Sequence, residues 1–174
     1  MLIVLSGLPG VGKTTLAREL ARRTGAQHLR IDAIEQALRE SSLGSRRMDD
    51  AGYRVAYAVA ADNLRLYRTV IADCVNPWPL TRDAWRQVGE NARVPVVEIE
   101  VVCSDHDEHR RRVEARASEA GDPALPTWRD VETRDYRPWE RERLVIDTAQ
   151  SSVGEALDLM RAAVSRARVP HCGV

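Results

Sequence analysis

The sequence predicts an α/β fold in which a five-stranded parallel sheet carries helices on both faces. Three observations predict it. Short apolar runs alternate with amphipathic segments about five times, the first run is apolar throughout, and a glycine-rich turn joins that run to a helix. Strands that are buried on both faces have continuous apolar sequences, and parallel strands need a crossing helix between them. The chain has 174 residues, 44% of them apolar, and we expect one domain over residues 1–168 with a tail over 169–174.

The first half of the chain supplies three predicted strands. Residues 2–5 form an apolar run that stops at a Ser-Gly pair, and the helix after the glycine-rich turn ends at Gly25. The second and third runs end at Asp32 and Asp73. The sequence predicts strands over 27–31 and 69–72, helices over 33–40 and 50–68, and a loop over 41–47.

The second half supplies two more strands and four helices. The clearest strand follows Pro95, and a break at 121–126 separates two helices. The sequence predicts a loop over 74–79, strands over 94–102 and 144–146, and helices over 80–92, 105–119, 127–136 and 151–166. Because ligands bind beyond the carboxyl ends of parallel strands, Asp32, Asp73 and the glycine-rich turn are expected to converge.

Composition excludes several classes of protein. Basic and acidic residues balance at 26 each, with a pI of about 6.9, so the overall charge does not indicate binding to duplex nucleic acid or to an anionic membrane. No apolar run is long enough to span a membrane, and no secretory leader is visible. Three scattered cysteines fit a reduced cytoplasm. The four histidines form no catalytic or metal set, and we expect surface or capping roles for them.

A phosphate-binding loop motif follows the first strand. Gly7-Leu8-Pro9-Gly10-Val11-Gly12-Lys13-Thr14 matches G-x-x-x-x-G-K-[ST] in full, with Thr15 next. Backbone N–H groups of such a loop surround phosphate oxygens, and the following helix N-terminus adds positive potential. Lys13 is expected to reach the outer phosphates and Thr14 to hold Mg²⁺ through its hydroxyl. The motif predicts a nucleoside triphosphate site.

Lysine is almost absent from the chain. Lys13 is the only lysine, and the other 25 basic residues are arginine. A bias that converts lysine to arginine wherever charge alone matters would spare a lysine whose compact ammonium is needed against a phosphate. Lys13 is therefore the first candidate catalytic residue.

Missing motifs narrow the class of nucleotide-binding protein. A GTPase guanine motif of the form [NT]-K-x-D is absent, because the chain has no second lysine. The second glycine-rich signature of an ABC-type ATPase is also absent, and the chain is too short for an AAA+ motor with its helical lid domain. A small phosphotransferase remains.

The chain resembles the P-loop kinases that include chloramphenicol phosphotransferase, zeta-toxin-like kinases, gluconate and shikimate kinases and the kinase half of polynucleotide kinase. The resemblance spans 2–166 and rests on the phosphate loop, Arg30–Glu35, Val70–Asp73, the arginines of 110–116 and Ile146–Thr148. It implies a three-layer P-loop kinase fold with a helical lid over about 110–137. It also implies transfer of the γ-phosphoryl group of Mg-ATP to a hydroxyl group.

The resemblance implies roles for two strand-end carboxylates. Asp32 is expected to be the general base for the attacking hydroxyl; the alternative is a helix N-cap. Asp73 resembles the aspartate that holds Mg²⁺ through water; the alternative is a turn residue.

Lid and adenine contacts follow from the same resemblance. Arg112 and Arg116 share a helix face and are expected to neutralise the transferring phosphoryl group, while Arg110 and Arg111 face solvent. The alternative is a solvated basic face that pairs with nearby acids. Asp147 and Thr148 follow the last strand, where related kinases contact adenine through the backbone.

The acceptor pocket is expected between Asp32 and Asp73, with Tyr53, Arg54, Tyr57 and Arg82 as candidate contacts; packing is the alternative for the tyrosines. Polynucleotide kinases carry an arginine three residues after the base, where this chain has Glu35. A small-molecule acceptor (a metabolite, nucleoside or antibiotic) is therefore favoured over nucleic acid, with no membrane partner and a monomer or homodimer. A nucleic-acid or tRNA-related kinase and a non-catalytic nucleotide switch remain alternatives.

Overall fold

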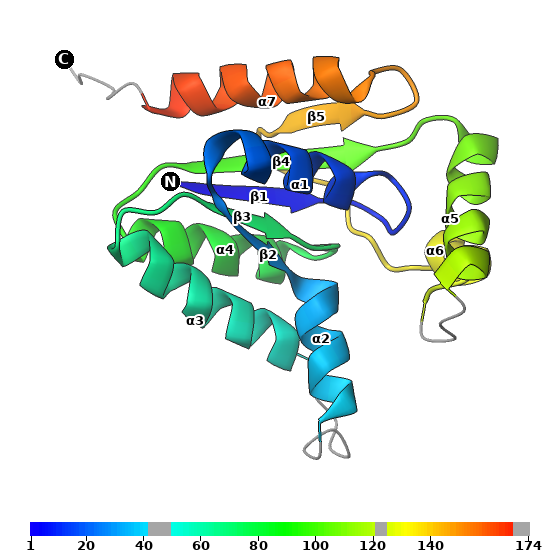
Figure 1. The fold of residues 1–174 in the computed structure, drawn as a ribbon, viewed down its shortest axis with the longest axis horizontal. Coiled ribbons are helices and arrows are strands. Elements are labelled where there is room, and N and C mark those ends of the chain that lie inside the picture. Colours follow the sequence, from blue (N-terminus) through cyan, green and yellow to red (C-terminus); the bar gives the residue numbers. More distant parts are fainter. Residues whose placement is uncertain (42–49, 121–124, 169–174) are drawn as a thin grey trace.

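The computed structural model describes residues 1–41, 50–120 and 125–168. Most of the predicted loop over 41–47, most of the break at 121–126 and the tail lie outside these ranges. Five strands and seven helices occupy these described ranges (Figure 1). The strands are β1 (Leu2–Ser6), β2 (Gln27–Arg30), β3 (Val70–Asp73), β4 (Val96–Val102) and β5 (Leu144–Asp147). The helices are α1 (Lys13–Thr24), α2 (Ile31–Glu40), α3 (Ala51–Arg65), α4 (Pro79–Asn91), α5 (His106–Ala120), α6 (Trp128–Glu132) and α7 (Val153–Arg168).

The five strands form one parallel sheet in the order β2-β3-β1-β4-β5. The predicted α/β class and the five-stranded parallel sheet are confirmed. Strand β1 is central, so the loop that follows it emerges between the carboxyl ends of β3 and β4. Leu5 lies in register with Asp73 of β3 and with Ile99 of β4. This topology brings the phosphate loop and Asp73 to one edge of the sheet.

Helices cover both faces of the sheet, which gives the predicted three layers (Figure 1). Alternate side chains of β1 point to opposite faces. Ile3 and Leu5 pack in the core under α1 and α7, whereas Leu2 and Val4 pack in the core under α3 and α4. Because all five residues of β1 are buried, the continuous apolar run follows directly from this position.

Several predicted elements differ from the structure in their bounds, and two of these differences bear on the site. The strand over 27–31 ends at Arg30, and Ile31 already begins α2. The helix over 127–136 is only α6, which ends at Glu132. A proline disfavours helix in the residue before it, and the segment leading to Pro138 is instead held by hydrogen bonds from Arg82 to the carbonyls of Arg137 and Pro138. None of the helices in the described ranges has the length and apolarity of a membrane span.

Candidate active site

The phosphate loop presents the backbone and helix terminus that an anion requires. Gly10 and Gly12 have positive φ angles of 86° and 99°, a region that glycine enters without steric cost. Gly12 is the N-cap of α1, and the first turn of α1 contains no acidic side chain. The positive end of this helix is therefore left for a bound anion.

The side chain of Lys13 folds back over the loop. Its Nζ donates to the carbonyl oxygens of Gly7 at 2.8 Å and Leu8 at 2.7 Å, and the residue is only 8% exposed. Burial lowers the pKa of Lys13, and the charges of Asp73 and Asp32 partly offset that effect. The ammonium thus lies in the loop, where the charges of two carboxylates act on it.

Asp73 is buried at the end of β3 and is held by two neighbours. Burial raises the pKa of Asp73, but hydrogen bonds from His28 and Thr14 and the charge of Lys13 outweigh burial and leave it below its usual value. The His28 Nε2 to Asp73 Oδ2 distance is 3.1 Å. His28 is therefore neither a surface nor a capping residue. A hydroxyl and a carboxylate oxygen together are a donor set that suits Mg²⁺.

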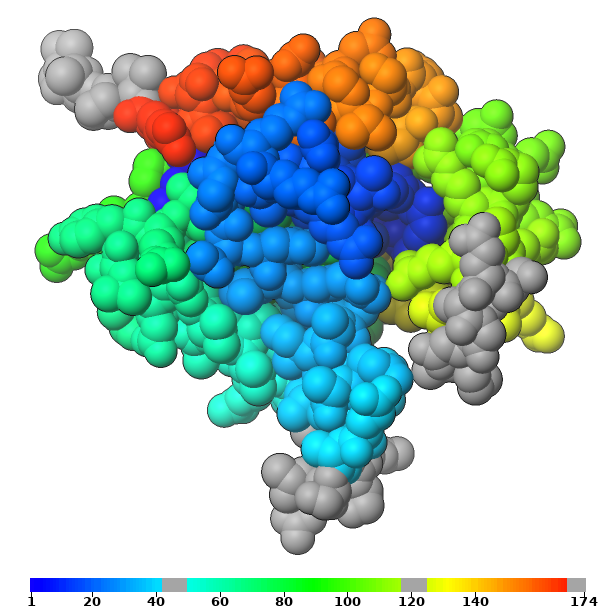
Figure 2. All heavy atoms as spheres, in the orientation of Figure 1, coloured from blue at the N-terminus to red at the C-terminus, as the bar shows by residue number. Residues whose placement is uncertain are grey.

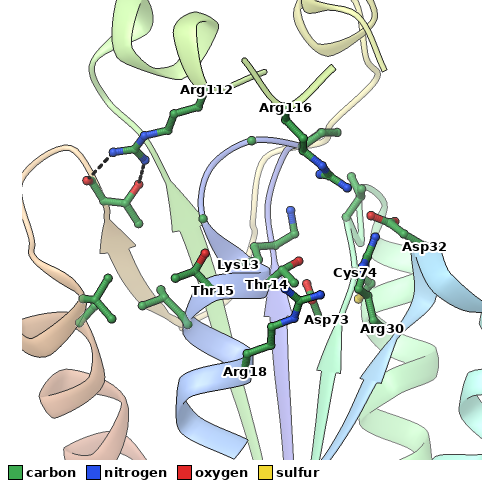
Figure 3. Close-up of a pocket in the computed structure, with 18 of the residues that line it drawn as sticks. Lys13, Thr14, Thr15, Arg18, Arg30, Asp32, Asp73, Cys74, Arg112 and Arg116 are labelled. Carbon is green, nitrogen blue, oxygen red and sulfur yellow. Dashed lines mark hydrogen bonds between the residues drawn. The ribbon is translucent and has the colours of Figure 1, made fainter. Parts of the chain in front are cut away.

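A cavity of about 900 Å³ lies over the phosphate loop (Figure 3). Most of the predicted phosphate, base, metal and lid residues line it: Pro9, Gly10, Gly12, Lys13, Thr14, Thr15, Asp32, Asp73, Arg112, Arg116 and Thr148. Gly7 and Val11, also predicted to bind phosphate, are buried and line neither cavity. Sequence reasoning missed Arg18, Arg30 and the serines at 151–152. These serines lie just before α7, and that position is the only feature of the sequence that could have identified them as lining residues.

A second cavity of about 1030 Å³ adjoins the first. Tyr53, Arg54 and Tyr57 line it as predicted, and Glu35, Arg39, Trp78 and Arg134 join them. Asp32, Arg30 and Arg116 line both cavities. The molecular surface is hollowed between α2 and α5, the helices that bring Asp32 and Arg116 to this boundary (Figure 2).

Asp32 is free of the capping role that was its alternative. The N-cap of α2 is Arg30, and no side chain caps this helix. Asp32 lies in the first turn of α2 and is exposed to the cavities. In Figure 3 its carboxylate and the guanidinium of Arg116 point toward the same space.

Arg112 contacts protein groups. Its Nη1 donates to Thr148 Oγ1 at 2.8 Å and its Nη2 to the Thr148 carbonyl at 3.2 Å, the two dashed lines in Figure 3. Its Nε donates to Glu108 at 2.8 Å. Arg112 therefore links α5 to the end of β5. Arg110 and Arg111 form exposed pairs with Glu114 and Glu108, as the solvated-face alternative expects.

Asp147 lies outside the lining of both cavities. Its carboxylate accepts hydrogen bonds from the backbone N–H groups of Ser104 and Ala149, each at 3.0 Å. The side chain of Asp147 therefore holds the turn after β5. The expected adenine contact, which the backbone would make, stays a prediction.

Arg82 departs from its predicted place in the acceptor pocket. It is 2% exposed and lines neither cavity. Its guanidinium donates to four backbone carbonyls, those of Asn76, Pro77, Arg137 and Pro138, and lies 4.3 Å from the ring centroid of Trp139. Arg82 therefore holds the segment after α6 against α4.

One family model and one relative in sequence place the chain among known proteins. Residues 2–135 match the AAA domain family AAA_33. The probable adenylyl-sulfate kinase of Aeropyrum pernix is 26% identical over 163 residues, which cover 88% of this chain and 86% of that protein.

Two solved structures share the fold. The APS kinase of Mycobacterium tuberculosis in complex with AMPPNP and APS has a TM-score of 0.63 at 18% identity, covering 94% of this chain and 96% of that one. A gluconokinase from Sinorhizobium meliloti 1021 has a TM-score of 0.62 at 19% identity, covering 94% and 91%.

The residues beyond the family match complete the same unit. β5 adds the outer strand of the sheet, and α7 packs on the core under α1. The chain belongs to the AAA domain family AAA_33 and has the fold of the P-loop kinases.

Proposed function

We propose that the protein transfers the γ-phosphoryl group of Mg-ATP to a hydroxyl group of a small molecule. One observation carries the proposal: Asp32 and Arg116 lie where the cavity over the phosphate loop meets a second cavity of similar size. Transfer between two substrates needs a donor site and an acceptor site that join at the reacting phosphorus. A nucleotide-dependent switch binds no second substrate, so a second cavity that opens onto the phosphate end of the first favours a transferase.

The first cavity is the proposed ATP site. Loop N–H groups, the N-terminus of α1 and Lys13 would bind the phosphates. The Thr14 hydroxyl and the Asp73 carboxylate would hold Mg²⁺, with Asp73 oriented by His28. When bound, Mg²⁺ supplies positive charge against the β- and γ-phosphate oxygens.

Asp32 and Arg116 are the proposed catalytic residues at the boundary. The acceptor oxygen forms a bond to the γ-phosphorus as the bond from that phosphorus to the β-phosphate oxygen breaks, and ADP leaves. The hydroxyl proton goes to the carboxylate of Asp32. Arg116 offers a planar cation to the equatorial oxygens.

The test is ADP release from Mg-ATP with a panel of sugars, sugar acids, nucleosides and short oligonucleotides. We expect one small acceptor to stimulate release, and Asp32→Asn to lower turnover by roughly 100-fold or more while ATP affinity stays the same. Glu40→Gln is the matched control, because it removes a carboxylate from the same helix at a position that lines neither cavity.

Two outcomes would contradict the proposal. Stimulation by oligonucleotides alone would assign the second cavity to a nucleic-acid end. Undiminished acceptor phosphorylation by Asp32→Asn would remove Asp32 as the base.

A further inference from the structure

Glu35 is an unusual side chain in the wall of the second cavity. It follows Asp32 by three residues on α2, so the two carboxylates lie on one face of the helix, with Cβ atoms about 5–6 Å apart. Glu35 lines the second cavity but not the first. It is thus placed beside the proposed base on the acceptor side.

Space for Glu35 depends on a glycine in the neighbouring helix. Gly52 is buried in α3, and a Cβ atom added there would clash with Glu35 Cγ and would lie 3.1 Å from its Oε1. The missing side chain at position 52 admits the Glu35 carboxyl group between α2 and α3.

The protein does not stabilise this carboxylate. Burial and the charge of Asp32 raise the pKa of Glu35, and the charges of Arg39 and Arg134 lower it by less. Among the described residues, none forms a hydrogen bond or an ion pair with Glu35. A half-buried acceptor group without a partner is costly in a folded protein unless a ligand satisfies it.

Aromatic side chains share the same cavity. Tyr53 and Tyr57 are four residues apart on α3, and their ring centroids lie 6.0 Å apart. Trp78 lines the cavity as well and is 46% exposed. Such rings offer apolar faces to the C–H groups of a compact ligand, while carboxylates accept hydrogen bonds from its hydroxyls.

We propose that Glu35 binds the acceptor by accepting a hydrogen bond from the hydroxyl next to the one that reacts at Asp32, so that the acceptor is a polyol with neighbouring hydroxyls. This inference rests on the proposed kinase function and names the substrate class of the same site. Asp32 acts on the reacting oxygen, and Glu35 fixes the orientation of the molecule that carries it.

The experiment compares matched acceptors in wild-type protein and variants. The probes are adenosine with 2′-deoxyadenosine and 3′-deoxyadenosine, and glucose with 2-deoxyglucose and glucosamine, each with Mg-ATP. For an acceptor that is phosphorylated, loss of the neighbouring hydroxyl is expected to raise KM by roughly 10-fold to 100-fold in wild-type protein. In Glu35→Ala the two members of the pair should have KM values within about twofold, because the discriminating partner is gone.

Gly52→Ala supplies a second variant. It keeps the carboxylate but displaces it, and alanine favours the helix, so the fold is retained while acceptor KM rises and ATP affinity stays unchanged. Glu40→Gln is the control for charge on α2.

Each result bears on a different claim. Unchanged discrimination in Glu35→Ala, with Asp32→Asn inactive, overturns the role of Glu35 and leaves the kinase. A preference for glucosamine over glucose that depends on Glu35 overturns the polyol class in favour of an ammonium ligand. If the protein phosphorylates none of the probes, the result contradicts the assignment of a polyol acceptor. If an acceptor without a second hydroxyl stimulates ADP release, the kinase function stands and the role proposed for Glu35 is wrong.

Discussion

His109 and Pro9 join α5 to the phosphate loop. The Nε2–H of His109 donates to the Pro9 carbonyl oxygen at 2.7 Å, and the ring is 6% exposed. The same helix packs against the loop at Gly10, where an added Cβ would lie 2.5 Å from Val113 Cγ2. The base of the predicted lid is therefore fixed to the donor site.

Removing the His109 ring should weaken both stability and nucleotide binding. His109→Ala leaves the partly buried Pro9 carbonyl without its donor and removes packing against Trp128, so we expect a loss of about 2–4 kcal/mol in the free energy of unfolding. ATP affinity should fall several-fold, because the loop loses a support. Chemical denaturation and titration with a fluorescent ATP analogue measure these effects. His109→Gln retains a hydrogen-bond donor and should recover part of the stability and part of the ATP affinity. Equal ATP affinity in the wild type and both variants would contradict a coupling between His109 and the phosphate loop.

Nucleotide should change hydrogen exchange unevenly across the predicted lid. Because His109 and Val113 hold the start of α5 on the loop, amides of 106–113 are expected to keep their protection with or without ATP. Amides of 125–137, which lie beyond that anchor, should gain protection when nucleotide binds. Hydrogen exchange followed by mass spectrometry tests this. A uniform change in protection over both segments would contradict the conclusion that His109 and Val113 fix the start of α5 to the loop.

Lysine at position 13 should not be replaceable by arginine. The Lys13 ammonium fits between two loop carbonyls in a buried position, and a planar guanidinium is larger and forked. We expect Lys13→Arg to bind ATP roughly 10-fold to 100-fold more weakly despite its equal charge. Arg23→Lys is a matched exchange at an exposed position of α1 and should bind ATP as the wild type does. Equal affinity in both variants would leave the single lysine unexplained.

Arg82 should prove structural. A lysine at this position cannot donate to all four carbonyls. Each buried carbonyl oxygen that is left without a donor destabilises the fold by up to about 1–3 kcal/mol. Arg82→Lys is expected to lower the free energy of unfolding by about 2–4 kcal/mol while ATP affinity changes little. Arg86→Lys, in an exposed pair on the same helix, should be neutral. A raised acceptor KM in Arg82→Lys without any loss of stability would restore the substrate role.

The stability effect of Glu35 should depend on pH. Its pKa is raised in the folded protein, so stability falls as pH rises from the unfolded pKa through the folded pKa. Glu35→Gln should therefore raise the melting temperature at pH 7, with a difference that shrinks below about pH 4, where both states are protonated. Thermal unfolding at the two pH values checks the sign, and Glu40→Gln should show no such trend. A lower melting temperature at pH 7 would mean that Glu35 stabilises the fold.

Local signals account for what the sequence predicted well. The phosphate loop is a contiguous motif, and Asp73 ends an apolar run, so parallel topology is enough to place them together. The carbonyl partners of Arg82 after α6 lie 55 and 56 residues away, the partner of His109 lies 100 residues away, and Asp147 bonds a backbone group 43 residues away. Periodicity carries no information about such contacts. The Glu35–Gly52 fit likewise depends on how α2 crosses α3.

Boundaries were less predictable than elements for a related reason. Ile31 continues the apolar pattern of β2, yet it belongs to α2 and is buried there against the core under α3 and α4. An apolar residue at a strand end satisfies either element, so only the packing decides. The one-residue shift moves Asp32 into the first helical turn.

Lys13 carries the only side-chain amine in the sequence, and this gives the protein a built-in chemical label. An acylating reagent directed at amines has one lysine to modify, and that lysine lies in the phosphate loop. Its lowered pKa increases the fraction of reactive free base, while a bound nucleotide would shield it. Beside any increment from the α-amine of Met1, the mass of the intact chain would then report occupancy of the loop through one further increment, without a reporter group attached elsewhere.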